Sequence, residues 1–492
     1  MDDFLNKLHH GRWWDSRRPD LTFNGILSFG EDNQAILVIR GKERDLPLVD
    51  YPRELTTMVG RLTSEPMDKI SVLNARRVRG PTNTHPPSED RETEVEFYGS
   101  RVVVGAHVED TNTPLINRLR FSLTDLEDWC AISRISGKSE VPDRTPDLGG
   151  EINEFDSVEV SFHSGTTDYF DIGDGKRLRF LSLYRGPLSF HLEKEVTLRV
   201  RNRIELIFPD RISVDKAVEE MRIWQTFISL GLGIPVFLED ILLRRDADHK
   251  NKPVDLIVTE RKWNPEKPRL YPYRVLLNQS KLGAKLGECL KAWRQKQEKI
   301  DVSVLLYRGA SYLHDAYIHI NTLTYLQALE VHHGELYTAD KFPNSQMKRD
   351  TLKALRSAIP KELDEGLREE ISQSLGWIGQ LSLRDRLKSL FDHYPKSLRP
   401  LFPVENQLDD LRRARNYLTH YSDDKDLTKD FMSSREVYVV GQKGRMFLEI
   451  CFLGAMDMSD DDIFELLKSH SVYGDLCAEA KYKMDQARRT SS

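Results

Sequence analysis

Three residues in the last quarter of the chain could do chemistry together: Arg415, Asn416 and His420, in the stretch RARNYLTHYSDD at 413–424. Histidine ordinarily titrates near neutral pH, and arginine binds phosphate or carboxylate groups through paired hydrogen bonds. This spacing is compatible with a ribonuclease site, and also with residues that only stabilise a helix. The surrounding sequence has to distinguish these two interpretations.

The segment 405–421, which holds these residues, has the spacing of an amphipathic helix. Arg415 falls within its apolar stripe, where a guanidinium needs a carboxylate or phosphate partner unless it reaches the rim. Glu330, in the helical segment 326–333, is a candidate partner. At about 100° per residue, the apolar stripe consists of Val404, Leu408, Leu411, Ala414 and Leu418, and the polar face of Asp409, Arg413, Asn416 and His420.

Spacing alone is weak evidence, because an arginine and a histidine five residues apart occur a second time, at Arg244 and His249. That second pair lies in a charged segment without apolar periodicity. The asparagine directly after Arg415 makes a chance origin much less frequent. A helix places Arg415 and His420 about 140° apart, so one copy of the helix gives a poorly converged site.

The composition is that of an ordinary folded protein with several domains. The 492 residues are 39% hydrophobic and 30% charged, which fits two or three domains. The formal net charge of −6 argues against a surface that is basic overall, so any contact with nucleic acid must be confined to one groove or helix.

Several other chemistries and compartments are disfavoured by the sequence. No phosphate-cradling GxxxxGK[ST] loop, GxSxG or HExxH motif occurs, and the pairs His9–His10 and His332–His333 lack cysteines or carboxylates at metal-ligand spacing. We therefore expect neither a cofactor nor a metal. No apolar stretch approaches the roughly 18 residues of a membrane span, and no signal peptide is visible. The four cysteines lack CxxC pairing and fit reduced thiols in a cytoplasmic protein.

The chain divides into a β-rich front and a helical rear. Short apolar-rich segments with Gly and Asp turns predict an antiparallel sandwich or barrel, joined by a helix near 213–231. The predicted class is an α+β multidomain protein with a β-rich domain at 1–272 and an all-α bundle at 273–492. The segments with helical periodicity in the rear are 273–299, 312–337, 344–358, 367–391, 405–421 and 444–457.

The stretch RNYLTH, in a late helix of an all-α domain, resembles the RNxxxH signature of HEPN ribonucleases. The earlier segment LQALEVHH resembles the first helix of that domain. The N-terminal sequence GRWWDSRRPDLTFNGILSFG, with AILVIRG after it, is similar to the β-rich front domain of ApeA-type bacterial anti-phage defence proteins. The resemblance thus implies an ApeA-like sensor domain at 1–272 and a HEPN ribonuclease domain at 273–492.

The resemblance also implies a reaction. HEPN nucleases work without metal: the 2′-OH of the RNA attacks the adjacent phosphate and leaves a 2′,3′-cyclic phosphate and a 5′-OH. His420 would move the protons, Arg415 would stabilise the charge of the phosphorane, and Asn416 would orient His420 or the phosphate. The implied protein is a cytoplasmic endoribonuclease of abortive infection.

Partners follow from the same resemblance. HEPN domains pair by two-fold symmetry, so a homodimer or a higher oligomer is expected, with two copies of the RNxxxH helix in one cleft. We expect RNA as the target, with tRNA favoured, and a phage protein as the trigger. Arg412, Arg413 and Tyr417 would bind flanking RNA, although the two arginines could equally pair with Asp409 and Asp410.

Two other interpretations stay open at this stage. The helical domain could be a non-catalytic HEPN-fold scaffold or antitoxin-like module that binds RNA or protein without cutting. Alternatively, the front domain could bind carbohydrate or peptide while the bundle serves only for dimerisation.

Overall fold

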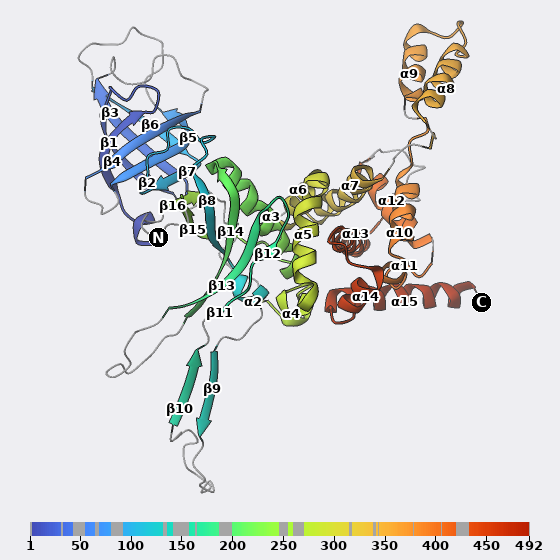
Figure 1. Ribbon diagram of the computed structural model, residues 1–492. Coiled ribbons are helices and arrows are strands. Elements are labelled where there is room, and N and C mark those ends of the chain that lie inside the picture. The colour runs from blue at the N-terminus through green and yellow to red at the C-terminus, as the bar shows by residue number, and fades with distance from the viewer. Residues whose placement is uncertain are drawn as a thin grey trace. The chain divides into compact units, whose positions relative to one another are not determined.

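The computed structural model describes residues 2–30, 33–42, 55–63, 68–79, 92–130, 135–140, 157–162, 165–185, 199–245, 254–258, 270–313, 317–337, 341–342, 344–376, 378–404, 406–419 and 432–491. The chain forms two compact units. The first contains Met1–Leu232, Val236–Arg269 and Leu277–Lys291, and the second contains Gly233–Pro235, Leu270–Leu276 and Ala292–Ser492. Strands dominate the first unit and helices the second (Figure 1). The predicted fold class is confirmed, while the boundary at residues 272 and 273 stays a prediction.

Part of the first unit is a closed ring of antiparallel strands (blue in Figure 1). The neighbour order runs β5-β4-β1-β2-β3-β6, and a further pairing of β5 with β6 closes the ring. The interior is apolar and centred on Trp13, whose side chain is fully buried. The strands are β1 (His9–Asp15), β2 (Phe23–Phe29), β3 (Ala35–Lys42), β4 (Thr56–Leu62), β5 (Lys69–Arg79) and β6 (Glu92–Gly99).

Two glycines make room for Trp13. A Cβ atom on Gly25 would lie 2.8 Å from the indole of Trp13, and one on Gly60 would lie 2.4 Å from it. Any side chain at either position would therefore push the indole out of its place. These glycines allow the largest side chain of the ring to fill its interior.

The same sheet continues beyond the ring as an open, antiparallel part in the order β7-β16-β15-β8-β14-β13-β11, with β12 also paired to β13. Its buried apolar side chains face α2 (Leu126–Cys130) and α3 (Val214–Leu232), the latter lying where a helix was expected near 213–231. The strands are β7 (Arg101–Val104), β8 (Ile116–Leu123), β11 (Gly165–Thr166), β12 (Phe170–Asp171), β13 (Arg177–Arg185), β14 (Arg199–Ile212), β15 (Leu238–Arg244) and β16 (Val254–Val258).

Two small elements complete the first unit. Helix α1 (Asp2–Leu5) precedes the ring, and β9 (Ile135–Glu140) pairs with β10 (Ser157–Phe162) as a separate two-stranded sheet.

The second unit is a helical bundle around α7, which packs against α6, α10, α12 and α13. The expected helix at 273–299 is broken into short pieces, because Gly283 adopts a positive φ of 51°. Helix α4 (Gln279–Leu282) and the first half of α5 (Leu286–Lys296) belong to the first unit. The helices that follow in the second unit are α6 (Asp301–Tyr312), α7 (Ile318–Leu336), α8 (Ser345–Ser357), α9 (Glu365–Leu375), α10 (Leu383–His393), α11 (Pro395–Leu398), α12 (Asn406–Thr419), α13 (Ser434–Ala455), α14 (Asp460–Lys468) and α15 (Ser471–Ser491).

The single helix expected over 367–391 is two helices, α9 and α10. Ser382 caps the start of α10 with a capping box. Its hydroxyl accepts a hydrogen bond from Asp385 N, and the Asp385 carboxylate accepts one from Ser382 N. Helices α8 and α9 pack on one another and contain no buried residue. The hairpin that they form therefore contributes little to the core of the bundle.

Helices α7 and α13 approach closely at a glycine. A Cβ on Gly441 would lie 2.2 Å from Thr322 Oγ1, so only glycine fits there. Deeper in the bundle, Tyr307 donates to Glu449 Oε1 at 2.8 Å, and Arg445 Nε donates to the same oxygen at 2.8 Å. This buried carboxylate is thus satisfied by two partners, which ties α6 to α13.

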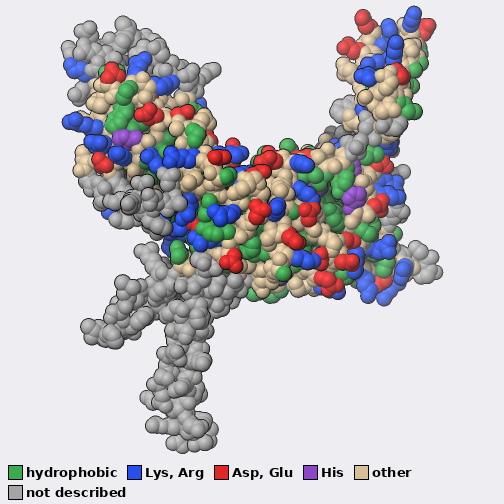
Figure 2. All heavy atoms as spheres, in the orientation of Figure 1, with side chains coloured by type: hydrophobic (Ala, Val, Ile, Leu, Met, Phe, Trp, Pro, Cys, Tyr) green, Lys and Arg blue, Asp and Glu red, His purple; other side chains and the backbone are tan. Residues whose placement is uncertain are grey.

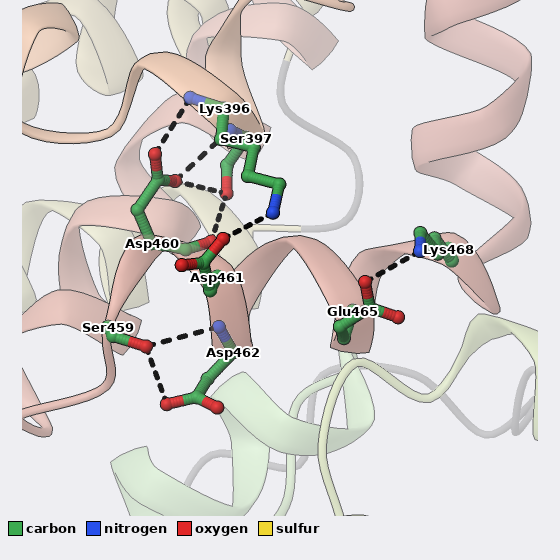
Figure 3. Close-up of polar contacts among 8 residues, drawn as sticks. All are labelled: Lys396, Ser397, Ser459, Asp460, Asp461, Asp462, Glu465 and Lys468. Atoms are coloured by element: carbon green, nitrogen blue, oxygen red, sulfur yellow. Dashed lines mark hydrogen bonds and ion pairs between the residues drawn. The ribbon is translucent and has the colours of Figure 1, made fainter.

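Helix α14 is joined to α11 by a carboxylate (Figure 3). Asp460 accepts hydrogen bonds from Lys396 N at 2.7 Å, Ser397 N at 3.1 Å and Ser397 Oγ at 2.6 Å. Ser459 caps α14 itself, because its hydroxyl accepts from Asp462 N at 3.2 Å. Side-chain caps therefore fix both the start of α14 and its neighbour.

The four cysteines are divided between the two units and form no disulfide. Cys130 and Cys289 are buried thiols of the first unit, while Cys451 is buried and Cys477 half-buried in the second.

On the visible face, outside the grey atoms, Lys and Arg side chains are interspersed with Asp and Glu (Figure 2). Within the described part of the chain, no helix is long and apolar enough to cross a membrane.

Candidate functional site on helices α7 and α12

Helix α12 is held in the bundle by its apolar stripe. Leu408, Leu411 and Ala414 are buried, as predicted, and α12 packs on α7, α10 and α13. Gly444 of α13 lies close to both neighbours, since a Cβ there would be 3.2 Å from Leu326 Cδ2 of α7, a tight contact, and 3.9 Å from Leu411 Cδ2 of α12, an ordinary one. The prediction for Val404 was wrong, because the helix begins after it and its side chain is 40% exposed.

Arg415 lies at the edge of this stripe beside Glu330 of α7. Its Nη2 atom is 3.9 Å from Glu330 Oε2, and the two side chains are 32% and 30% exposed. Arg415 Nε is buried and makes no hydrogen bond to any residue that the structure describes. A guanidinium has five N–H donors, so one long ion pair leaves Arg415 with donors for an incoming anion.

Glu330 is anchored through its backbone by a residue that the sequence did not single out. Arg386 of α10 donates from Nη1 to Glu330 O at 3.2 Å and from Nε to Leu381 O at 3.2 Å. It thereby ties α10 to the turn of α7 that carries the carboxylate. No spacing pattern could have marked Arg386, because its partners are backbone carbonyls rather than side chains.

Asn416 follows Arg415 on α12 and is half-buried. His420 lies outside the described residues. The structure therefore places Arg415 beside Glu330, with Asn416 next to Arg415 in the chain, and the place of His420 beside them stays a prediction.

The charged residues earlier on α12 pair among themselves. Arg412 Nε lies 3.4 Å from Asp409 Oδ1, and Arg413 Nη1 lies 3.6 Å from Asp410 Oδ1. Arg384 of α10 also reaches Asp409, at 3.5 Å. Burial raises the pKa of Asp410, and the positive charges around it work in the opposite direction. Arg412 and Arg413 are thus paired with aspartates of their own helix.

RNA binding by Arg412 and Arg413 stays a prediction, as it does for the half-buried Tyr417.

The histidine pair of α7 lies inside the bundle. Burial and the charge of the neighbouring His333 lower the pKa of His332 to about 4, so His332 is neutral at physiological pH. His332 Nδ1 is 3.3 Å from Ser303 Oγ. Among the described residues, no group of three or more His, Cys, Asp or Glu side chains is placed to hold a metal ion.

These features define a class of protein: a front unit built on a β-ring, followed by a HEPN-type helical bundle whose late helix carries adjacent arginine and asparagine residues. The family model described as ApeA N-terminal domain 1 matches residues 8–293, and the model described as Apea-like HEPN matches residues 323–462. The first match covers more than half of the chain, so the protein belongs to the ApeA family of HEPN-domain defence proteins. The predicted family is confirmed.

The HEPN match includes every residue of the candidate site, from Glu330 to His420. HEPN domains are generally associated with ribonuclease activity, and they typically dimerise and act on RNA. No curated protein and no solved structure matches this chain.

Proposed function

We propose that this protein is a metal-independent endoribonuclease that cuts host RNA, with tRNA as the favoured target, during abortive infection. The observation that carries the proposal is the placement of Arg415. A guanidinium on a firmly packed helix, with one long ion pair to Glu330 and an Nε atom that hydrogen-bonds to no described residue, suits a phosphate better than a purely structural role.

In the proposed reaction, the 2′-OH of the RNA attacks the adjacent phosphorus, and the 5′-oxygen of the next nucleotide leaves. His420 removes the proton from the 2′-OH and returns one to the leaving oxygen. Arg415 donates to the non-bridging oxygens, on which negative charge builds up. Asn416 orients His420 or the phosphate, and the products carry a 2′,3′-cyclic phosphate and a 5′-OH.

Glu330 supports Arg415 in this scheme. A carboxylate 3.9 Å away holds the guanidinium near one orientation without occupying all its donors. The tie from Arg386 to the Glu330 carbonyl fixes the carboxylate's backbone. We therefore assign Glu330 as a positioning residue for Arg415.

The active form in this proposal is a homodimer through the HEPN domain. Arg415 and His420 are about 140° apart on an ideal helix, so two symmetry-related copies of α12 are needed to surround one phosphate. The first unit senses a phage protein and releases the activity.

The test is cleavage of purified total tRNA in the presence of EDTA, with and without lysate from phage-infected cells. Wild type, Arg415→Ala and His420→Ala are compared, and His319→Ala serves as the matched control because His319 is an exposed histidine of α7. We expect cutting by wild type and His319→Ala only, with 2′,3′-cyclic phosphate ends.

Two results would contradict the proposal. Cutting by a well-folded His420→Ala protein would remove His420 from the site. Failure of wild type to cut tRNA, or total RNA from infected cells, under either condition would favour the non-catalytic scaffold that binds RNA or protein.

A further inference from the structure

The open part of the sheet in the first unit has a face rich in arginine. Side chains alternate along a strand, so residues two apart share a face. The alternate residues, such as Leu119, Phe121 and Ile204, are buried on the other face. The residues that we call the arginine face are Arg118 and Arg120 of β8, Arg177 and Arg179 of β13, Arg201 and Arg203 of β14, and Arg244 of β15.

Strand register confirms that these side chains are neighbours. Arg120 is paired directly with Glu205 of β14, and Glu205 is paired with Arg179 of β13. Arg118 is paired with Arg244 across β8 and β15. Directly paired residues of an antiparallel sheet point to the same side, so the arginines share one face of four strands, with Glu205 and Ile207 between those of β8 and β13.

A single buried glutamate organises the centre of this face. Arg179 Nε donates to Glu205 Oε2 at 2.6 Å, Arg120 Nε donates to Oε1, and Arg118 Nη1 lies 3.8 Å from Oε1. Tyr169 also donates to Glu205 Oε2, at 2.8 Å. Burial works to raise the pKa of Glu205, but hydrogen bonds from Arg120 and Tyr169 and the charges of Arg120 and Arg179 outweigh it. Three guanidinium groups thus share one carboxylate.

The face carries more positive than negative charge. Its seven arginines are accompanied by five acidic residues, Asp171, Glu205, Glu239, Asp240 and Asp255, which leaves an excess of 7 − 5 = 2 positive charges. Asp240 pairs with Arg201 at 2.5 Å and with Arg203 at 3.6 Å. Burial raises the pKa of Asp255.

Two arginines at one end of the face have no carboxylate partner among the described residues. Arg177 lies over the ring of Tyr169, 5.1 Å from its centroid, and makes no ion pair within the described strands. Arg244 Nε is buried without a hydrogen bond to any described residue. Burial lowers the pKa of Arg244, and so do the charges of Arg120 and Arg118. These groups gain most from an added anion.

The side chains of the arginine face suit a ligand with several phosphates in a line. All its cations are arginines, and β8, β13, β14 and β15 contain no lysine. Arginine's planar fork binds phosphate oxygens bidentately and can stack on bases. Arginines two apart on a strand are about 6.7 Å apart, which spreads the donors along a line rather than around one ion. Tyr169 adds an aromatic ring under Arg177 and Arg179.

We propose that the arginine face binds single-stranded nucleic acid through its phosphates. Open sheet faces with basic and aromatic side chains are a common way to bind single strands, whereas an extended acidic peptide would preferentially join a sheet edge. This site lies entirely in the first unit and is separate from the residues of α7 and α12. The first unit would thus bind a ligand independently of the candidate site in the second unit.

The test is fluorescence anisotropy of the full chain with a fluorescein-labelled oligodeoxythymidine of roughly 20 nucleotides, titrated at several salt concentrations. DNA lacks the 2′-OH that the proposed cleavage needs, so the oligonucleotide stays intact during the measurement, and the variants in the first unit separate binding at the arginine face from binding at the HEPN site. The main variant is Arg177→Ala with Arg244→Ala, because neither residue holds Glu205. Arg12→Ala with Arg18→Ala removes the same charge from exposed positions of the same unit and is the control.

Wild type and the control should bind alike. The double variant should bind at least about tenfold more weakly. The slope of log affinity against log salt should fall in magnitude by about 1.4, or by about 0.7 in Arg177→Ala alone, which serves if the double variant does not fold.

The proposal fails if wild type does not bind the oligonucleotide, or if the variants bind with wild-type affinity and slope. It also fails if poly-glutamate binds more tightly than the oligonucleotide, since the face would then take an acidic polypeptide.

Discussion

Replacing Leu411 tests how the candidate site is held in the bundle. The Leu411 side chain is fully buried on α12, and its neighbours there include Gly444 of α13. Leu411→Ala removes its apolar surface and leaves a cavity that packed helices fill only in part, which costs about 2–5 kcal/mol of the free energy of unfolding. For a unit of about 200 residues, that loss corresponds to a melting temperature roughly 4–20 °C lower.

The measurement is thermal unfolding followed by circular dichroism at a helix-sensitive wavelength, since helices dominate the second unit. Val404→Ala is the matched control, because Val404 is apolar but 40% exposed and should change the stability by less than about 0.5 kcal/mol. A Leu411→Ala protein that melts within about 1 °C of wild type would refute the packing argument. Equal losses in both variants would refute the assignment of α12's buried face.

Three further predictions concern buried groups away from the candidate site. Lys443 is 5% exposed, its Nζ lies 5.4 Å from the centroid of the Phe402 ring, and burial lowers its pKa to about 8 from 10.5. Below pH 8 the Lys443 amine is protonated in both the folded and the unfolded state, and the folded state is destabilised by the buried charge. Lys443→Met should therefore raise the melting temperature at pH 7. This gain should disappear as the pH rises toward 10.5, where the amine is neutral in the folded state and loses its proton in the unfolded state as well. Gly441→Ala should destabilise the bundle by roughly 1–3 kcal/mol, and Thr322→Ala in the same chain should restore part of the loss in urea unfolding, because Thr322 Oγ1 is the atom that clashes. Glu205→Gln should cost the first unit about 3–5 kcal/mol, measured by urea unfolding, since it leaves several arginines facing a neutral amide; an unchanged midpoint would contradict this account.

The class of fold could be predicted because apolar periodicity changes from strand-like to helical along the chain. The boundaries of the helices could not, because they depend on local turns. Gly283 at positive φ breaks the segment 273–299, and the capping box of Ser382 divides 367–391. The strand that contains Trp13 is fixed by Gly25 and Gly60 on neighbouring strands, a contact that no single segment reveals.

The candidate site was partly predictable for a similar reason. Helical spacing placed Arg415 in the apolar stripe. A guanidinium there needs an anionic partner, and Glu330 was predicted as that partner. The support from Arg386 runs through a backbone carbonyl, so side-chain patterns carry no trace of it. The arginine face was also missed, because its members come from four strands that are far apart in sequence and meet only through sheet register.

The placement of the cysteines gives each unit its own internal reporter. Cys130 and Cys289 are buried in the first unit and Cys451 in the second, so an alkylating reagent reaches them only when the surrounding unit opens. Burial also raises the pKa of Cys451, which keeps its thiol protonated and slow to react in the folded bundle. Mass spectrometry of peptides from partly alkylated protein would therefore time the opening of the two units separately in one sample. The native chain needs no added dye or engineered tag for such an experiment.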